Sequence, residues 1–252
     1  MNLPLAGRRA LVTGAGRGVG LATARLFAEQ GAEVVLHANT ATDRAREVAA
    51  ALGARALGVV AADLSQPGAG AALFAQADVL AGGRLDVLVN NAGIYRASAL
   101  AASDRDWHAA WADTLQVNLQ AVADLCRAAV LAFAGRGGGC LVNIGSRAGH
   151  RGDDADHAAY AASKGGVLAL TRTIARAYGK DGVLAYALAP GWIDTEMARQ
   201  EAAAMAAAAR EIPIGRVATA EEIAAVCAFL ASGACASATG TCIDINGASY
   251  VR

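Results

Sequence analysis

The chain has 252 residues, of which 55% are hydrophobic and 17% charged, which is typical of a globular protein with a large core and excludes a disordered chain. Lysine and arginine together number 22, as do aspartate and glutamate, so no overall charge favours nucleic acid or an anionic membrane as a partner. The N-terminal segment contains no long apolar stretch typical of a signal peptide, and no uninterrupted apolar run reaches membrane-spanning length. We therefore expect a cytoplasmic protein that binds neither nucleic acid nor membrane.

The cysteines and histidines show no pattern of a disulfide framework or a metal site. The five cysteines are odd in number and form no CxxC pair, which favours buried free thiols in a reducing compartment. The four histidines lack the spacing of metal ligands, and we predict no metal.

Short runs rich in valine and leucine alternate with longer alanine-rich stretches along the chain. The runs predict strands over 9–14, 33–38, 56–63, 85–90, 140–145, 183–190 and 241–245. They show little alternation of polar and apolar residues, as expected for strands buried on both faces of a parallel sheet. Helices are predicted over 18–30, 41–52, 67–81, 104–134, 158–179, 195–209 and 219–231. This order predicts an α/β fold, a doubly wound parallel sheet of seven strands with helices on both faces.

No linker rich in proline, glycine or serine divides the chain, and there is no internal repeat. GRGGGC at 135–140 is too short to separate domains and predicts a tight turn into a strand. EAAAMAAAAR at 201–210 predicts a mobile helical segment, because alanine is the strongest helix former. We expect residues 1–252 to form a single domain.

The motif TGAGRGVG at 13–20 follows the first predicted strand and opens a helix. Gly14, Gly18 and Gly20 would allow a sharp turn, a close approach to a pyrophosphate and tight packing of the helix on the sheet. The helix N-terminus, which includes Val19, would supply free N–H groups and a partial positive charge. A structural turn also needs glycine, but the strand before and the helix after the motif favour nucleotide binding.

In YAASK at 160–164, Tyr160 and Lys164 are four residues apart and share one face of a predicted helix. The lysine could be a surface residue, or it could hold the phenol in a reactive state. A free tyrosine has a pKa of about 10. An ammonium within about 4–6 Å of the phenol, together with a bound pyridinium cofactor, would lower this pKa by ~1–3 units. We expect Lys164 to make Tyr160 a competent general acid and base.

Four further motifs follow predicted strands. Asp63-Leu64 ends the third strand, NNAG at 90–93 ends the fourth, Ser146 follows the fifth, and PGWIDT at 190–195 follows the sixth. The carboxyl ends of parallel strands lie at one edge of a sheet, where ligands bind at the point at which strand order reverses. We expect these motifs and the glycine loop to converge there.

These motifs resemble, in type and order, those of the short-chain dehydrogenase/reductase family in its single-domain subgroup, over nearly the whole chain. The resemblance implies a Rossmann-type fold and hydride transfer between a nicotinamide cofactor and a carbonyl or secondary alcohol. The glycine spacing differs from the TGxxGxxG motif of the family's longer sugar-nucleotide epimerases and dehydratases, which disfavours those reactions.

The resemblance also implies roles for four catalytic residues. Tyr160 would exchange the proton with the substrate oxygen, Ser146 would hydrogen-bond that oxygen, and Lys164 would also bind the nicotinamide ribose. Asn118, in LQVNLQA, would anchor a water leading from Lys164 towards solvent. Taken alone, the tyrosine could be a core aromatic, the serine a turn residue and the asparagine a surface side chain.

Further residues would contact the cofactor by the same resemblance. Asp63 and Leu64 would contact the adenine, although Asp63 could also be a helix N-cap residue. Asn90 would tie loops together and contact the ribose region, with Ala92 and Gly93 keeping side chains away, unless NNAG is only a structural turn. Near the nicotinamide we expect Pro190, Gly191, Ile193 and Thr195.

The end of the second predicted strand bears on the choice of cofactor. Ala38 stands where the family's NAD-preferring members usually place an aspartate, so no carboxylate repels a 2′-phosphate. The residues that would contact the phosphate are Arg17, Asn39, Thr40 and Arg44. We therefore favour NADP(H), with NAD(H) as the alternative. Asp43 would reverse this choice if its side chain turned towards the ribose.

The substrate is less well indicated. The loop RAGHRGDDADHAA at 147–159 should line one wall of the substrate site, and its polarity fits either a polar substrate such as a sugar or polyol, or a solvated rim. Tyr95, Trp192, Met197 and segment 195–214 should form the other wall, and that segment resembles the family's substrate lid.

Two narrower functions remain alternatives. A 3-oxoacyl-acyl-carrier-protein reductase would need a basic patch beside the cleft, for which Arg136 and Lys180 are candidates. A non-catalytic dinucleotide-sensing regulator could share the fold, but it should have lost Tyr160 or Lys164.

The predicted helices at 104–134 and 158–179 carry apolar faces that are too wide for one sheet contact each. Family members commonly pair these helices into dimers and add the C-terminal strand to make tetramers. We expect a homotetramer that uses 242–252 in its second interface, with a homodimer as the alternative.

Overall fold

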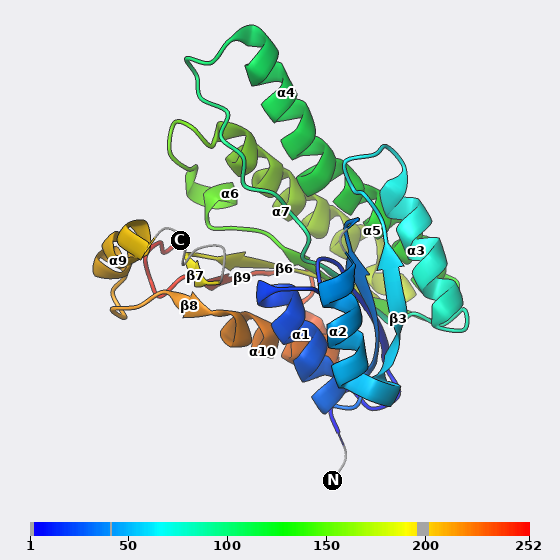
Figure 1. The fold of residues 1–252 in the computed structure, drawn as a ribbon. Helices are drawn as coiled ribbons and strands as arrows, with labels where there is room; N and C mark the ends of the chain where they lie inside the picture. The colour runs from blue at the N-terminus through cyan, green and yellow to red at the C-terminus, as the bar shows by residue number, and fades with distance from the viewer. Residues whose placement is uncertain (1–2, 41, 196–201) are drawn as a thin grey trace.

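A computed structural model describes residues 3–40, 42–195 and 202–252 of the chain. Its central sheet has seven parallel strands in the order β3-β2-β1-β4-β5-β6-β9 (Figure 1). The strands are β1 (Arg9–Val12), β2 (Glu33–Ala38), β3 (Ala56–Ala61), β4 (Val87–Asn90), β5 (Gly139–Ile144), β6 (Val183–Pro190) and β9 (Cys242–Ile245). Six lie within predicted runs and β5 begins one residue before its run, so the predicted doubly wound α/β sheet is confirmed.

Helices cover both faces of this sheet (Figure 1). On one face lie α1 (Gly18–Glu29), α2 (Asp43–Leu52) and α10 (Ala220–Ala231), and on the other lie α3 (Ala69–Leu80), α5 (Ala121–Ala134) and α7 (Ala158–Tyr178). Each face therefore has its own hydrophobic core: the first core lies under α1, α2 and α10, and the second core lies under α3, α5 and α7. In β1, the side chains of Ala10 and Val12 lie in the first core and that of Leu11 lies in the second. Because successive side chains point to opposite faces, a strand with a core on each side must be apolar throughout.

The structure adds elements that the sequence did not predict. The expected helix over 104–134 consists of α4 (Asp104–Leu115), a π-helical turn at Gln116–Gln120, and α5. A short helix, α6 (Ala148–Arg151), follows Ser146, and β7 (Ile193–Asp194) pairs with β8 (Ala218–Thr219) outside the main sheet. Helix α9 (Ala202–Glu211) overlaps the end of the helix predicted over 195–209, of which 196–201 lie outside the described residues.

The continuous helical stretch Asp104–Ala134 is 31 residues long and apolar enough to cross a membrane by length and composition alone. The expectation concerned uninterrupted apolar runs, and charged residues such as Asp113 and Asp124 interrupt this stretch. Helices in the core of a folded domain pass the same test, and here Leu125, Cys126 and Phe133 are buried in the second core. The finding is therefore weak evidence for a membrane span.

Strand order reverses between β1 and β4, which are neighbours although two strands separate them in the chain. The glycine loop leaves β1 at this point and enters α1. A Cβ on Gly20 would overlap the carbonyl oxygen of Gly14 and lie 2.6 Å from Asn91 Nδ2. The helix can therefore start this close to the sheet only with glycine at position 20.

We predict that Gly20→Ala lowers the free energy of unfolding by about 1–3 kcal/mol, the usual cost of overpacking, because backbone atoms must shift. Gly179→Ala is the matched control, since its Cβ would meet nothing within 4 Å and its φ of −59° suits any residue. Urea unfolding of both variants measures the difference. Equal stability of the two would show that Gly20 is not required for packing.

Candidate active site

The glycine loop is held by side chains from β2 and from the end of β4. The Gly14 N–H donates to His37 Nδ1 at 3.1 Å, and His37 Nε2 lies 3.0 Å from the Ala62 carbonyl oxygen. Because Nδ1 accepts a hydrogen bond, Nε2 must carry the proton that is donated to Ala62. Burial lowers the pKa of His37, which favours this neutral form. No local feature of the sequence indicates that His37 braces the loop.

The loop leaves the start of α1 available to a ligand. Gly14 and Gly18 have φ values of +66° and +53°, a region that favours glycine. Arg17, which precedes the helix, makes no capping hydrogen bond with its side chain. The first N–H groups of α1 therefore have no side-chain cap from Arg17, as a pyrophosphate-binding turn requires. Val19 and Gly20, the next predicted contacts, are buried in the first helical turn.

The two asparagines of the NNAG motif make different hydrogen bonds, and these differ from the predicted ones. Asn90 is buried and donates to Asn143 Oδ1 at 2.8 Å and to Cys126 Sγ at 3.3 Å. The loop tie expected of Asn90 is instead made by Asn91, whose Nδ2 donates to the Thr13 carbonyl oxygen at 2.9 Å. The prediction that Asn90 ties the loops together is therefore wrong.

The predicted adenosine end lies at the carboxyl ends of β2 and β3. Asn39 and Thr40 are exposed directly after Ala38. Asp43 is also exposed and accepts a hydrogen bond from Arg46 at 3.2 Å, on its own helix. The Gly16 backbone approaches α2 closely enough that a Cβ there would lie 4.0 Å from Arg44 Cβ. Arg44 is therefore placed beside the glycine loop.

Asp63 forms a turn after β3 and accepts a hydrogen bond from the Ser65 N–H at 3.0 Å. Hydrogen bonds from Ser65 hold the pKa of Asp63 below its usual value, so the carboxylate is ionised at neutral pH. Asp63 lies six positions before α3, which rules out the N-cap alternative for that helix. The neighbouring Leu64 is buried in the second core.

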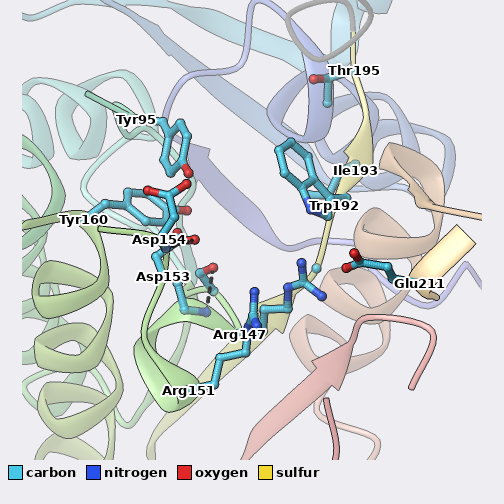
Figure 2. A pocket seen from close by; sticks show the side chains of 13 residues that line it. Tyr95, Arg147, Arg151, Asp153, Asp154, Tyr160, Trp192, Ile193, Thr195 and Glu211 are labelled. Carbon is cyan, nitrogen blue, oxygen red and sulfur yellow. Dashed lines mark hydrogen bonds between the residues drawn. The ribbon is translucent and has the colours of Figure 1, made fainter. Parts of the chain in front are cut away.

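Ser146 and Tyr160 line one cavity of about 560 Å³ at the carboxyl edge of the sheet (Figure 2). Ser146 follows β5, and Tyr160 lies in the first turn of α7. Ser146 Oγ accepts the Ala148 N–H at 3.1 Å, and its hydroxyl is within hydrogen-bonding reach of the Tyr160 phenol. Gly191, Ile193 and Thr195 line the same cavity, as expected of the motif after β6.

Burial dominates the state of the Tyr160 phenol in this structure. Burial raises the pKa of Tyr160, and its interaction with Ser146 only partly opposes this effect. Lys164 Nζ lies 5.7 Å from the centre of the Tyr160 ring and donates to the Ile144 carbonyl oxygen at 2.8 Å. The lowering expected from Lys164 together with a bound pyridinium cofactor stays a prediction, since burial is the largest effect on the phenol here.

Behind these residues lies a buried polar cluster. Asn118 is in the π-helical turn, and its amide pairs with both the N–H and the carbonyl oxygen of Ile94 at 2.8 Å. Its Nδ2 also lies 3.3 Å from Ser163 Oγ. A Cβ on Gly93 would lie 3.1 Å from Asn118 Oδ1 and 3.6 Å from Lys164 Nζ. The NNAG turn thus brings glycine between the asparagine and the lysine.

An aromatic stack borders the cavity beside Tyr160. The Tyr95 ring stacks on His157 with centroids 3.8 Å apart and meets Tyr160 edge-on at 4.8 Å. His157 Nδ1 lies 2.7 Å from Asp154 Oδ1, which ties the stack to the loop after α6. Tyr95 therefore lines the cavity on the side of the loop 147–159 and Tyr160, and not beside Trp192 as predicted (Figure 2).

The residues that line the remaining walls agree in part with the predicted ones. The cavity is lined by Arg147, Arg151, Asp153 and Asp154 of the predicted polar loop, and by Trp192. Glu211, at the end of α9, also lines it and lies within the segment 195–214 that was predicted for the other wall. Met197, predicted for the same wall, lies outside the described residues.

Three other predicted residues lie elsewhere. His150 Nε2 lies 3.3 Å from Cys242 Sγ, and these atoms group with an Asp244 oxygen within 4.8 Å. Arg252 already pairs with Asp244 at 3.0 Å, so we assign no metal to this group.

Arg136 and Lys180 come just before β5 and β6, at the opposite edge of the sheet from Ser146, so they form no basic patch beside the cavity. Arg136 is also paired with Asp78 at 2.7 Å.

A dinucleotide-type loop and a hydroxyl-lined cavity at one sheet edge define a nicotinamide-dependent oxidoreductase. A family model described as Enoyl-(Acyl carrier protein) reductase matches residues 14–248. The chain is 36% identical over 256 residues to the 3-oxoacyl-[acyl-carrier-protein] reductase FabG of Vibrio cholerae, with all of both chains covered. It is 40% identical over 251 residues to the cis-4-hydroxycyclohexanecarboxylate dehydrogenase of Sinomonas cyclohexanicum, covering 98% of each chain.

The solved structures agree with these relatives. A crystal structure of a 3-oxoacyl (acyl-carrier-protein) reductase from Agrobacterium tumefaciens with NADP bound has a TM-score of 0.87 and 34% identity, over 98% of this chain and 95% of that one. The chain belongs to the short-chain dehydrogenase/reductase family, as its motifs predicted. It is an oxidoreductase that transfers hydride between a nicotinamide cofactor and a carbonyl or secondary alcohol.

Burial of Lys164 leads to a testable pH dependence. Burial lowers the pKa of Lys164 from 10.5 to about 8. Between these pH values the unfolded chain binds a proton that the folded chain does not, so this residue makes wild-type stability rise with pH. We predict that wild-type stability relative to Lys164→Met increases by up to about 3 kcal/mol between pH 7 and pH 10.

Urea unfolding of both proteins at the two pH values measures this change. Lys180→Met removes the other lysine of the chain, which is exposed, and its difference from wild type should change little. A Lys164→Met difference that is also constant with pH would contradict the lowered pKa.

Proposed function

We propose that the chain is an NADP(H)-dependent reductase of small carbonyl compounds, acting through Ser146, Tyr160, Lys164 and Asn118. The observation that carries the proposal is that Ser146 and Tyr160 line one cavity at the sheet edge where the glycine loop also lies. Lys164 and Asn118 are buried directly behind them. A carbonyl oxygen in the cavity would be within reach of both hydroxyl groups.

The nicotinamide ring, when bound, supplies or accepts the hydride. In reduction, Tyr160 gives its phenolic proton to the carbonyl oxygen. Because burial raises the pKa of Tyr160, the phenol is protonated at neutral pH, which is the form that reduction needs. Ser146 donates its hydroxyl proton in a hydrogen bond to the same oxygen, since Ala148 occupies an acceptor position of Oγ. Lys164 supplies the positive charge beside the Tyr160 ring.

The proposed preference for NADP(H) rests on the end of β2. No carboxylate faces the ribose from Ala38, and Asp43 is turned to Arg46 on its own helix. Asn39 and Thr40 follow Ala38 and are exposed, and Arg44 lies beside the glycine loop that contains Arg17. The relative from Agrobacterium tumefaciens has NADP bound, which supports the same choice.

The substrate assignment stays at the level of carbonyl compounds and secondary alcohols. A 3-oxoacyl-acyl-carrier-protein reductase is the second candidate, because relatives with that name are 34–37% identical over almost the whole chain. The relative from Sinomonas cyclohexanicum is named for a small cyclic hydroxy acid instead. Both names describe an oxygen-bearing carbon within an acidic or acyl compound.

We also propose that the whole chain is one catalytic domain and forms a homotetramer, with a homodimer as the alternative. Strand β9 is at the edge of the seven-stranded sheet, so another subunit could meet it there. Leu131 on α5 is 58% exposed, which supports an apolar contact along that helix.

We predict that the wild-type protein binds NADPH at least tenfold more tightly than NADH, about 1.4 kcal/mol. Ala38→Asp should raise the Kd for NADPH at least tenfold, because its carboxylate repels the 2′-phosphate, and should affect NADH less. Paired titrations that follow nicotinamide fluorescence give all four constants.

Ala50→Asp is the control, because it adds the same charge at an exposed position of α2. Tighter binding of NADH by the wild type would overturn the cofactor choice. Absence of binding by either dinucleotide would overturn the proposed function itself.

We predict that Tyr160→Phe lowers kcat for NADPH-dependent ketone reduction by about 10²–10⁴-fold, because the proton donor is lost. NADPH binding should weaken less than tenfold, since the ring remains. Tyr178→Phe removes a hydroxyl at the far end of α7, outside the cavity, and should leave kcat near the wild-type value. A Tyr160→Phe rate within threefold of wild type would contradict the role of the phenol.

A further inference from the structure

Two guanidinium groups line the cavity next to the proposed reactive hydroxyls. Arg147 directly follows Ser146 in the chain, and Arg151 ends α6 one turn later. Figure 2 shows both side chains extending into the cavity, Arg151 from α6 and Arg147 from the position just before it, with Tyr160 and Tyr95 on another wall. Both belong to the loop predicted to line the site, but no role was predicted for either.

Arg147 is held in place before any substrate arrives. Its Nη1 donates to Ser249 Oγ at 2.5 Å, and its backbone N–H donates to the Pro190 carbonyl oxygen at 3.0 Å. Burial, followed by the charge of Arg151, lowers the pKa of Arg147. Two like charges thus lie at the two ends of the short helix α6, an arrangement that an anion between them would stabilise.

The acidic groups of the cavity do not neutralise this pair by direct contact. Within the described parts of the chain, neither guanidinium lies within 4.0 Å of a carboxylate oxygen. Asp154 is engaged by His157 at 2.7 Å, and Asp153 accepts the Asp154 N–H at 3.1 Å. Glu211 faces the cavity from α9 and acts on Arg147 only at longer range.

We propose that Arg147 and Arg151 bind a carboxylate of the substrate, so that the enzyme acts on small oxo acids and the corresponding hydroxy acids. This inference rests on the proposed function, because it takes Ser146 and Tyr160 as the groups that bind the reacting oxygen. A guanidinium fork matches a carboxylate with two parallel charge-assisted hydrogen bonds.

The cavity limits the size of this substrate. Ser146, Arg147 and Arg151 all line it, so a compound that places its carboxylate at the arginines and its carbonyl oxygen at Ser146 must fit within this one space. Such a compound fits a cavity of about 560 Å³ without any carrier protein.

The first test separates binding from catalysis. Cyclohexanecarboxylate and its methyl ester, neither of which can be reduced at a ketone, are titrated onto the protein loaded with NADP⁺ and followed by calorimetry. We expect the carboxylate to bind at least tenfold more tightly than the ester. Arg151→Gln should reduce this preference at least tenfold, Arg151→Lys should reduce it less, and Arg25→Gln, an exposed arginine on α1, should leave it unchanged.

The second test uses the reaction. We expect 4-oxocyclohexanecarboxylate to be reduced with a KM at least tenfold below that of its methyl ester, with similar kcat, and Arg151→Gln to remove most of the difference. Equal KM values, or equal binding of the two non-reducible ligands, would overturn the carboxylate site. Reduction of the ester by the wild type would still support the proposed function in that case.

A phosphate-bearing substrate gives a different result. If Arg151→Gln raises the KM for acetoacetyl-CoA at least tenfold but leaves the preference for the oxo acid over its ester unchanged, the arginines bind thioester phosphates and the carboxylate proposal is wrong. Failure of the proposed function is recognised separately, by absence of both dinucleotide binding and ketone reduction.

Discussion

The placement of the whole site depends on one close contact, between the start of α1 and the loop that leaves β1. Without a side chain on Gly20, the helix approaches the Gly14 carbonyl oxygen directly. Asn91 then reaches from the end of β4 to the carbonyl oxygens of Thr13 and Gly14, at 2.9 and 3.3 Å. This contact fixes the helix N-terminus at the point where strand order reverses, so its N–H groups face the edge at which the other motifs end.

The second requirement is that the polar groups behind the reacting hydroxyls are satisfied by protein atoms. Lys164 donates to the Ile144 carbonyl oxygen, and Asn118 pairs with both backbone groups of Ile94. Since an unpaired buried polar group is costly, these side chains have few alternative positions. The same burial raises the pKa of Tyr160 and lowers that of Lys164. The site therefore holds a protonated phenol at neutral pH and loses its lysine charge in mild alkali.

The strands and the position of the site could be predicted from the sequence because both depend on local signals. An apolar run buried on two faces is visible in any short window, and parallel strands share one carboxyl edge. The errors involve long-range contacts. Asn90 and Asn91 are identical neighbours, and only pairing with β5 decides which one turns inward to Asn143. The role of His37 and the raised pKa of Tyr160 likewise depend on burial by distant segments.

The substrate side connects the chemistry to the C-terminal segment. Arg147 is oriented by its hydrogen bond to Ser249, which lies in the segment 242–252 that we propose for a subunit interface. A substrate carboxylate that binds Arg147 therefore acts on a side chain whose position depends on that segment. Any association that orders Ser249 would strengthen carboxylate binding, and by linkage the bound carboxylate would strengthen the association by the same factor. Under these two proposals, substrate selection and assembly share one guanidinium group.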